Sequence, residues 1–346
     1  MAYTTIDKPT DYFNTVLYTG NGGSQNITGV GFSPNWVWLK GRNNANNNNL
    51  NDTVRGVNKQ IYSDLTNAET TATTHLTSFD SDGFTLGNDG AVNGSSDTYV
   101  SWNWLAGGTA SSNTDGSITS SVSANTTAGF SIGTYTGNGS AGATIGHGLG
   151  VAPKMIIAKN RGDVENWAVY HAGMGSPSKY LKLDSTDASV TDNAIWDGAY
   201  PTASVIYLGS GNKVNSSGDT YVFYSFAEKK GYSKFGSYTG NGNADGTFVY
   251  TGFKPAWVIL KRTDSADSWV MIDNKRVGYN NGNNVLEAND SVAEDSGVAD
   301  RQDILSNGFK LRSTWTKINA SGGSYIYMAF AENPFVTSTG IPTCAR

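Results

Sequence analysis

The sequence predicts an all-β protein: three tandem, homologous, antiparallel β-sandwich (jelly-roll-like) modules in an elongated subunit. First, the pentapeptide Tyr-Thr-Gly-Asn-Gly occurs at 18–22, 135–139 and 238–242. Second, turn residues recur at intervals of about ten residues. Third, almost no window has the period of an amphipathic helix. A tandem repeat of about a hundred residues therefore determines the fold.

The repeat extends well beyond the pentapeptide. Downstream of each copy, a proline leads a bulky apolar run that a lysine closes six positions later, at Lys40, Lys159 and Lys261. Near the end of each segment, a Val-Asn or Ile-Asn pair precedes a tyrosine by a constant spacing. The modules are predicted at 1–106, 107–230 and 231–346, the last with a flexible C-terminal tail.

Strand composition in the first module begins at 12–17 and is followed by a Gly/Asn turn and a second strand at 26–32. Residues 36–39 are apolar on both alternating faces, which predicts a central strand covered on both sides. The asparagine tract 43–49 cannot bury area and is predicted to be an exposed loop tip. The closing strand, 99–104, alternates large apolar with small polar residues.

Two acidic motifs have modest structural interpretations. Asp52 and Arg55 have a counterpart in Asp273 and Arg276, and a local ion pair of this kind contributes under about 1 kcal/mol if it is exposed. The segment 79–84 spaces its acidic residues like a Ca²⁺ loop. However, it lacks the later ligands and the terminal Glu that such a loop needs, so a tight turn is favoured.

The second module begins with a Ser/Thr/Gly-rich linker at 107–129, with room for one edge strand. The Gly-rich stretch 144–150 resembles a phosphate cradle, but a strand and not a helix follows it, so a turn or bulge is favoured. In the third module, 285–305 is rich in Ala, Glu and Asp and is the one place where a short helix is predicted.

Composition excludes several classes of protein. The net charge is −5 and the pI is about 5.2, which argues against nucleic acid as a partner. A single cysteine, Cys344, allows no intrachain disulfide and no Cys-rich zinc site. The N-terminus lacks a signal peptide and no apolar run could span a membrane, so we expect synthesis in a host cytoplasm without membrane insertion.

No pattern of catalytic residues stands out, and we expect no enzyme, no cofactor and no metal site. The three histidines fall at different places in the repeat. The chain has more aromatic residues than three small cores can bury, so some are expected to reach solvent. In loops rich in Asn, Ser and Gly, exposed aromatic faces are suited to bind sugar rings. The tentative ligand-binding candidates are Trp167, Tyr170, His171, Trp196, Trp269 and Trp315. A plain surface histidine remains the alternative at His171.

Four stretches, 13–22, 78–87, 148–157 and 329–335, resemble an uncharacterised module that recurs in virion structural proteins of marine tailed bacteriophages. The resemblance spans nearly the whole chain. It implies a component of the virus particle, at an appendage or surface, and supplies no catalytic or ligand residues. The second module departs from the pattern because it lacks the Asp/Arg element of its neighbours.

The leading hypothesis is a tail fibre or fibre-like appendage on the virion surface that binds a host glycan or receptor passively through many weak contacts. Its other partners would be virion proteins, and a homotrimer is expected by analogy with phage fibres. The alternative is a capsid decoration or head-fibre protein with a mainly structural role. A depolymerase is a third and weaker hypothesis.

Overall fold

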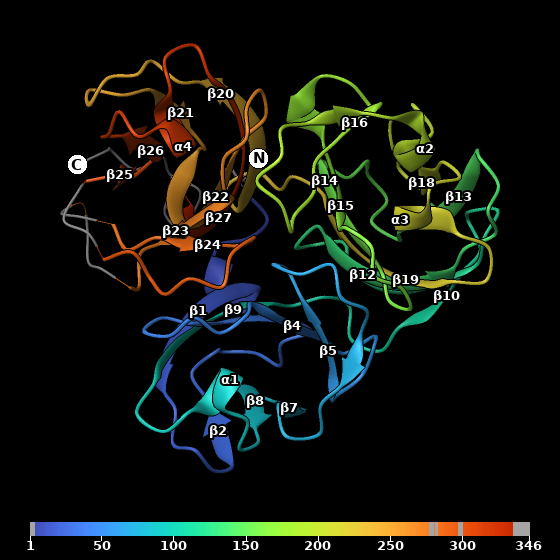
Figure 1. The fold of residues 1–346 in the computed structure, drawn as a ribbon, viewed down its shortest axis with the longest axis horizontal. Helices are drawn as coiled ribbons and strands as arrows, with labels where there is room; N and C mark the ends of the chain where they lie inside the picture. The colour runs from blue at the N-terminus through green and yellow to red at the C-terminus, as the bar shows by residue number, and fades with distance from the viewer. Residues whose placement is uncertain (1–3, 277–279, 281–282, 297–299, 335–346) are drawn as a thin grey trace.

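The protein consists of three two-layered lobes around a common centre, as Figure 1 shows from blue through green to red. The computed structural model describes residues 4–276, 280, 283–296 and 300–334. All of its sheet pairings between named strands are antiparallel, which confirms the predicted all-β class. The module boundaries stay predictions: 1–106 is the first module, 107–230 the second and 231–346 the third.

Each lobe contains one large sheet. The first, in spatial order, is β1 (Phe13–Thr19), β9 (Thr98–Trp104), β3 (Trp36–Gly41), β4 (Asn49–Asp52), β5 (Lys59–Tyr62) and β6 (Thr70–Thr71). The second is β10 (Ser111–Asn113), β11 (Ser120–Asn125), β12 (Phe130–Thr136), β19 (Thr220–Phe226), β14 (Met155–Asn160) and β15 (Ala168–His171). The third is β20 (Ser233–Thr239), β27 (Ser324–Pro334), β22 (Phe253–Arg262), β23 (Val270–Asp273) and β24 (Leu286–Glu287). The order β1-β9-β3-β4 thus recurs as β12-β19-β14-β15 and as β20-β27-β22-β23.

A small sheet and a one-turn helix cover the outer face of each large sheet. The small sheets are β2 (Gln25–Ile27), β8 (Gly83–Leu86) and β7 (Leu76–Asp80); β13 (Ala143–Gly146) and β18 (Val205–Leu208); and β21 (Phe248–Tyr250), β26 (Gly308–Leu311) and β25 (Gln302–Leu305). The helices are α1 (Gly90–Asn93), α3 (Asn212–Asn215) and α4 (Thr316–Asn319), with α2 (Asn193–Trp196) added in the second lobe. Smaller elements are η1 (Pro9–Asp11), η2 (Ala172–Met174), β16 (Lys179–Tyr180) and β17 (Val190–Thr191). Each outer layer closes a separate apolar cluster.

The inner faces of the three large sheets meet in one shared aromatic core. Trp36 of the first sheet lies 4.5 Å from Trp104 and 4.5 Å from Tyr224 of the second sheet, between ring centroids. Trp104 in turn lies 5.5 Å from Trp257 of the third sheet. The central strands are therefore covered on both faces, as their apolar pattern predicts. The modules were expected to be strung along an elongated subunit with separate cores. They instead surround this core, because each inner face is too apolar to be left in water.

The buried lysine of each module joins it to the preceding one. The side chains of Lys40, Lys159 and Lys261 are fully buried, and burial lowers the pKa of each to about 8. Each Nζ donates to a carbonyl oxygen in another module: Lys40 to Ser291 (2.7 Å), Lys159 to Thr66 (3.1 Å) and Lys261 to Thr186 (3.0 Å). The first module thus contacts the third, the second contacts the first and the third contacts the second. These contacts close a ring, and we call them the module joints.

The repeated pentapeptide is a structural motif. The Tyr18 ring stacks on Tyr99 of the closing strand, with centroids 5.1 Å apart. The backbone N–H of Asn21 donates to the side chain of Asn93, a buried residue at the end of α1. A Cβ at Gly20 would lie 2.2 Å from a backbone oxygen, so only glycine fits there. The same contacts recur in the other modules: Tyr135 with Tyr221, Asn138 with Asn215, Tyr238 with Tyr325, and Asn241 with Asn319.

Several local expectations differ from the structure. The predicted linker 107–129 contains two strands, β10 and β11, which extend the second large sheet. The described part of 285–305 contains short strands and no helix. The tract 43–49 is exposed only in part, because Asn48 and Asn49 are buried. The predicted flexible tail at 335–346 lies outside the described residues.

Candidate functional site

Two of the four tryptophans expected to be free for ligands, Trp167 and Trp269, lie buried at the module joints. They are 0% and 1% exposed. Trp167 Nε1 donates to the carbonyl of Tyr62 in the first module at 2.8 Å, and Trp269 Nε1 donates to that of Lys182 in the second at 2.8 Å. In the first module the corresponding residue is Asn48, whose Nδ2 donates to carbonyl oxygens of the third. These indole rings therefore hold modules together.

His171 is also buried, at 1% exposure. Its Nδ1 accepts from the N–H of Gly173 at 3.0 Å, and its Nε2 lies 3.0 Å from the carbonyl of Tyr327 in the third module. Since a carbonyl can only accept, Nε2 carries the proton and the ring is neutral. Burial lowers the pKa of His171 to about 4. His171 is therefore not a surface histidine, and both of its ring nitrogens contact backbone groups of the protein.

The remaining aromatic candidates do not come together in one site. Tyr170 and Trp196 are each 2% exposed and pack edge to face, with ring centroids 6.4 Å apart, in the outer cluster of the second module. Trp315 is half-buried beneath Arg301, whose Cζ lies 4.2 Å from the ring centroid. The expectation that these rings reach solvent is therefore wrong for all of them except, in part, Trp315. The joints and the outer clusters use them.

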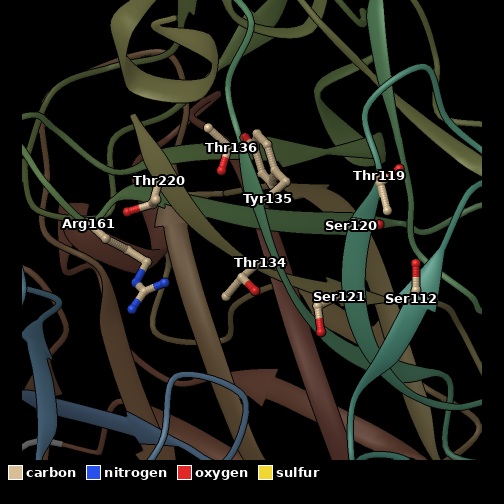
Figure 2. Close-up of a pocket in the computed structure, with 9 residues that line it drawn as sticks. All are labelled: Ser112, Thr119, Ser120, Ser121, Thr134, Tyr135, Thr136, Arg161 and Thr220. Atoms are coloured by element: carbon tan, nitrogen blue, oxygen red, sulfur yellow. The ribbon is translucent and has the colours of Figure 1, made fainter. Parts of the chain in front are cut away.

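The structure instead shows an open groove of about 330 Å³ at the edge of the second large sheet. Figure 2 shows its lining, which consists almost entirely of hydroxyl side chains with one guanidinium at one side. The lining residues are Ser112, Thr119, Ser120, Ser121, Thr134, Tyr135, Thr136, Arg161 and Thr220.

The groove exists because β10 and β11 extend this sheet beyond the shared core. Ser121 pairs with Thr134, and Thr134 pairs with Val222. Directly paired residues point to the same side of a sheet, and Val222 belongs to the shared core. The groove is therefore the outward continuation of the core-facing surface, at the point where apolar residues give way to hydroxyls.

Two of the lining hydroxyls have structural roles. Ser120 Oγ donates to the carbonyl of Gly146, and Tyr135 Oη donates to that of Val214. For the other six hydroxyls, no hydrogen bond to another residue within the described ranges is found. These six are Ser112, Thr119, Ser121, Thr134, Thr136 and Thr220. They are available to hydrogen-bond with water or a ligand.

The guanidinium of Arg161 is held in place from the first module. Its Nε and Nη2 donate to the two carboxylate oxygens of Glu69 at 3.0 and 2.8 Å. Burial raises the pKa of Glu69, but the hydrogen bonds from Arg161 and the charge of Arg55 outweigh it, so the net shift is downward. The pair stays ionised at neutral pH, which fixes the guanidinium beside the hydroxyls.

A second hydroxyl-lined groove, of about 390 Å³, occupies the corresponding edge of the third large sheet. Ser237 and Thr239 stand there in place of Thr134 and Thr136, and η2 and β16 of the second module help to line it. Its polar groups include Lys179 and Asp264. A groove of this kind thus recurs within one chain.

The sequence contained one signal for the first groove. Ile118, Val122 and Ala124 recur at even spacing within the Ser/Thr-rich stretch and pack in the outer cluster of the second module. Such alternation is typical of a half-buried strand. The Ser, Thr and Gly composition of 107–129 predicts a linker, and this composition hides the strand period that places the hydroxyls in the groove.

Among the described residues, no group of three His, Cys, Asp or Glu side chains could hold a metal ion. None of the helices in this part of the chain is long and apolar enough to cross a membrane. A family model described as "Domain of unknown function (DUF7483)" matches residues 8–334. No curated protein and no solved structure matches the chain.

Proposed function

Since the chain belongs to the DUF7483 family, we propose a function from the chain's own groove and sequence: a bacteriophage virion structural protein that binds a host-surface glycan passively. In this proposal the protein is a tail fibre or fibre-like appendage, exposed on the particle. The phage assignment rests on the resemblance of the four sequence stretches to virion structural modules. The binding assignment rests on the groove.

The observation that carries the binding proposal is the set of six available hydroxyls beside a fixed guanidinium. Glycans present many hydroxyl groups that both donate and accept, and serine and threonine hydroxyls match them because they also do both. Arg161 adds a donor for a sugar oxygen or a carboxylate. An open groove lined by short hydroxyl side chains gives weak single contacts, and repetition in the particle converts these into avidity.

The groove is suited to hold a ligand and not to cleave one. Hydrolysis of a glycoside requires two carboxyl groups that flank the bond. The ionisable side chains that line the groove are Arg161 and Tyr135, and the tyrosine hydroxyl already donates within the protein. The nearest carboxylate described above, Glu69, is occupied by Arg161 and Arg55. The lining residues therefore include no carboxyl group that could act as the acid or the base of glycoside cleavage.

A direct test measures binding of purified host polysaccharide to the full chain by isothermal titration calorimetry. The variant S121A/T134V removes two groove hydroxyls, and we expect it to weaken binding roughly tenfold, at about 0.5 to 1.5 kcal/mol for each hydrogen bond. Unchanged affinity in this variant would contradict the groove as the site. New reducing ends in the incubated polysaccharide would replace passive binding by depolymerase activity.

A capsid decoration or head-fibre protein is the second candidate. The observation in its favour is that the module joints close a ring, which makes one rigid block from three sheets in a single chain. A block of this kind suits a structural role on a shell, where it need not bind a host. Antibody labelling of intact particles separates the two candidates, because a fibre places the label on the tail and a decoration protein places it on the head.

A further inference from the structure

Two large aromatic side chains lie in the open on the outer sheet of the third module. Phe248 and Tyr250, both on β21, are 44% and 55% exposed, while Val249 between them is 6% exposed. Residues two apart on a strand point to the same side, so the two rings share one face. Neither ring belongs to the shared core or to the outer apolar cluster of the third module.

The corresponding positions in the other modules carry no rings. Val249 pairs with Phe309, as Ile27 pairs with Phe84 in the first module. The residues beside Ile27 are Asn26 and Thr28, both polar and exposed. In the second module the positions are Thr144 and Gly146, where a Cβ on Gly146 would lie 1.6 Å from an oxygen of Asn113. The sheet therefore needs no aromatic residue here for folding.

Charged groups that can form hydrogen bonds border the rings. They lie on β25 and β26 and at the nearby positions 245 and 312. Lys310 pairs directly with Phe248, and Asp303 pairs with Lys310. Lys310 Nζ lies 2.6 Å from Asp245, and Arg312 lies 3.4 Å from Asp303. Two cations and two anions balance, so the border has no net charge. Beside Tyr250, the paired residue is Gly308, which leaves one flank of the ring uncovered.

We propose that Phe248 and Tyr250 form a stacking platform for a neutral hexose ring of a glycan. The axial C–H face of a pyranose is apolar and fits an aromatic face, and its equatorial hydroxyls reach the bordering Lys310, Asp245 and Asp303. A balanced border does not favour an anionic sugar. This site is on a different module and a different layer from the hydroxyl groove, and it does not depend on binding there.

The size of the platform favours a sugar over a protein partner. A buried aromatic side chain covers about 150 to 250 Å², and two half-exposed rings offer roughly 200 Å² together. A specific protein interface needs about 800 Å² on each partner. One or two sugar rings match the available apolar area.

Saturation-transfer difference NMR on the full chain tests the platform with methyl β-D-glucopyranoside, methyl β-D-galactopyranoside and methyl α-D-mannopyranoside as probes. We expect transfer to the protons of one sugar face for at least one probe. F248N/Y250T installs the residues of the first module and should weaken that signal roughly tenfold, because two ring contacts are lost. F248Y/Y250F keeps both rings and should retain the signal. The reverse exchange, N26F/T28Y, should add a second platform and raise the signal.

Two controls separate this site from others. Tyr200, 54% exposed on the second module, provides the matched single ring, and Y200S should leave the transfer unchanged. S121A/T134V should also leave it unchanged, so failure of the groove and failure of the platform are distinguishable. The proposal is overturned if the wild-type chain shows no transfer from any probe, or if F248N/Y250T retains it. It is also overturned if sedimentation shows self-association that F248N/Y250T abolishes, since the rings would then be a protein interface.

Discussion

The second module differs from the first and third at one corner of the large sheet. In the first module β4 ends at Asp52, and in the third module β23 ends at Asp273. In the second module the corresponding strand, β15, ends at His171. All three occupy the same register, opposite Trp36, Trp257 and Met155. The two aspartates form fully buried ion pairs with Arg55 and Arg276, whereas the histidine is neutral and forms no ion pair with any residue in the described ranges.

The difference teaches that the fold requires a hydrogen-bonding pattern at this corner and not a charge. Asp52 accepts from the N–H groups of the turn that follows it and from Tyr224 Oη of the second module, at 2.7 Å. His171 accepts from the turn through Nδ1 and bonds to the third module through Nε2. Each residue therefore closes its turn and binds the neighbouring module. An ion pair performs both tasks in one case and an imidazole in the other.

The largest expected effect comes from removing charge at this corner. D52N leaves the buried guanidinium of Arg55 without its main partner, and breaking a buried ion pair costs about 3 to 5 kcal/mol. H171N retains an acceptor and a donor and should cost only about 1 kcal/mol. Urea unfolding of both variants measures the difference. Equal losses would contradict the view that one module uses charge and the other does not.

The next effect is a pH dependence that belongs to His171. Its pKa is about 4 in the folded chain, and about 6.5 is usual for an unfolded chain. Between these values the unfolded state binds more protons, so the free energy of unfolding is full above pH 6.5 and falls as the pH approaches 4. The loss attributable to this residue is up to about 3 kcal/mol. Urea midpoints from pH 7 to pH 4 should decline less steeply in H171N, which keeps the other buried histidines as an internal control.

The contrast between modules also explains what the sequence could predict. The apolar run 36–39 correctly predicted a strand that is buried on both faces. This was possible because burial on both faces is encoded in the strand's own residues. The partners of Trp167 and His171 lie in other modules, 105 and 156 residues away, and no local pattern encodes them. The Asp/Arg element was visible in two modules. In the second module, His171 takes the place of the aspartate. Only the strand register, in which His171 pairs with Met155, reveals this replacement.

A moderate effect is expected at the tryptophans of the module joints. W167F and W269F each remove one indole N–H and leave a part-buried carbonyl oxygen without that donor, which costs about 1 to 3 kcal/mol. Because the joints form a ring, the two losses should be similar although the modules differ at their corners. Thermal unfolding of both variants tests this. A loss of stability confined to W167F would show that the joint between the first and second modules contributes more than the joint between the second and third.

The smallest effect on stability is expected in the hydroxyl-lined groove of the second large sheet, which β10 and β11 extend. The variant S121A/T134V removes hydroxyls with no hydrogen bond to another described residue, so the free energy of unfolding should change by less than about 0.5 kcal/mol. S63A is the matched control, since Ser63 Oγ donates to the buried carbonyl of Ala288 across a joint at 2.6 Å. That variant should lose about 1 kcal/mol. If S121A/T134V were as costly as S63A, the groove hydroxyls would have a structural role. If it is silent in urea unfolding, a loss of glycan binding in the same variant reports on the groove alone.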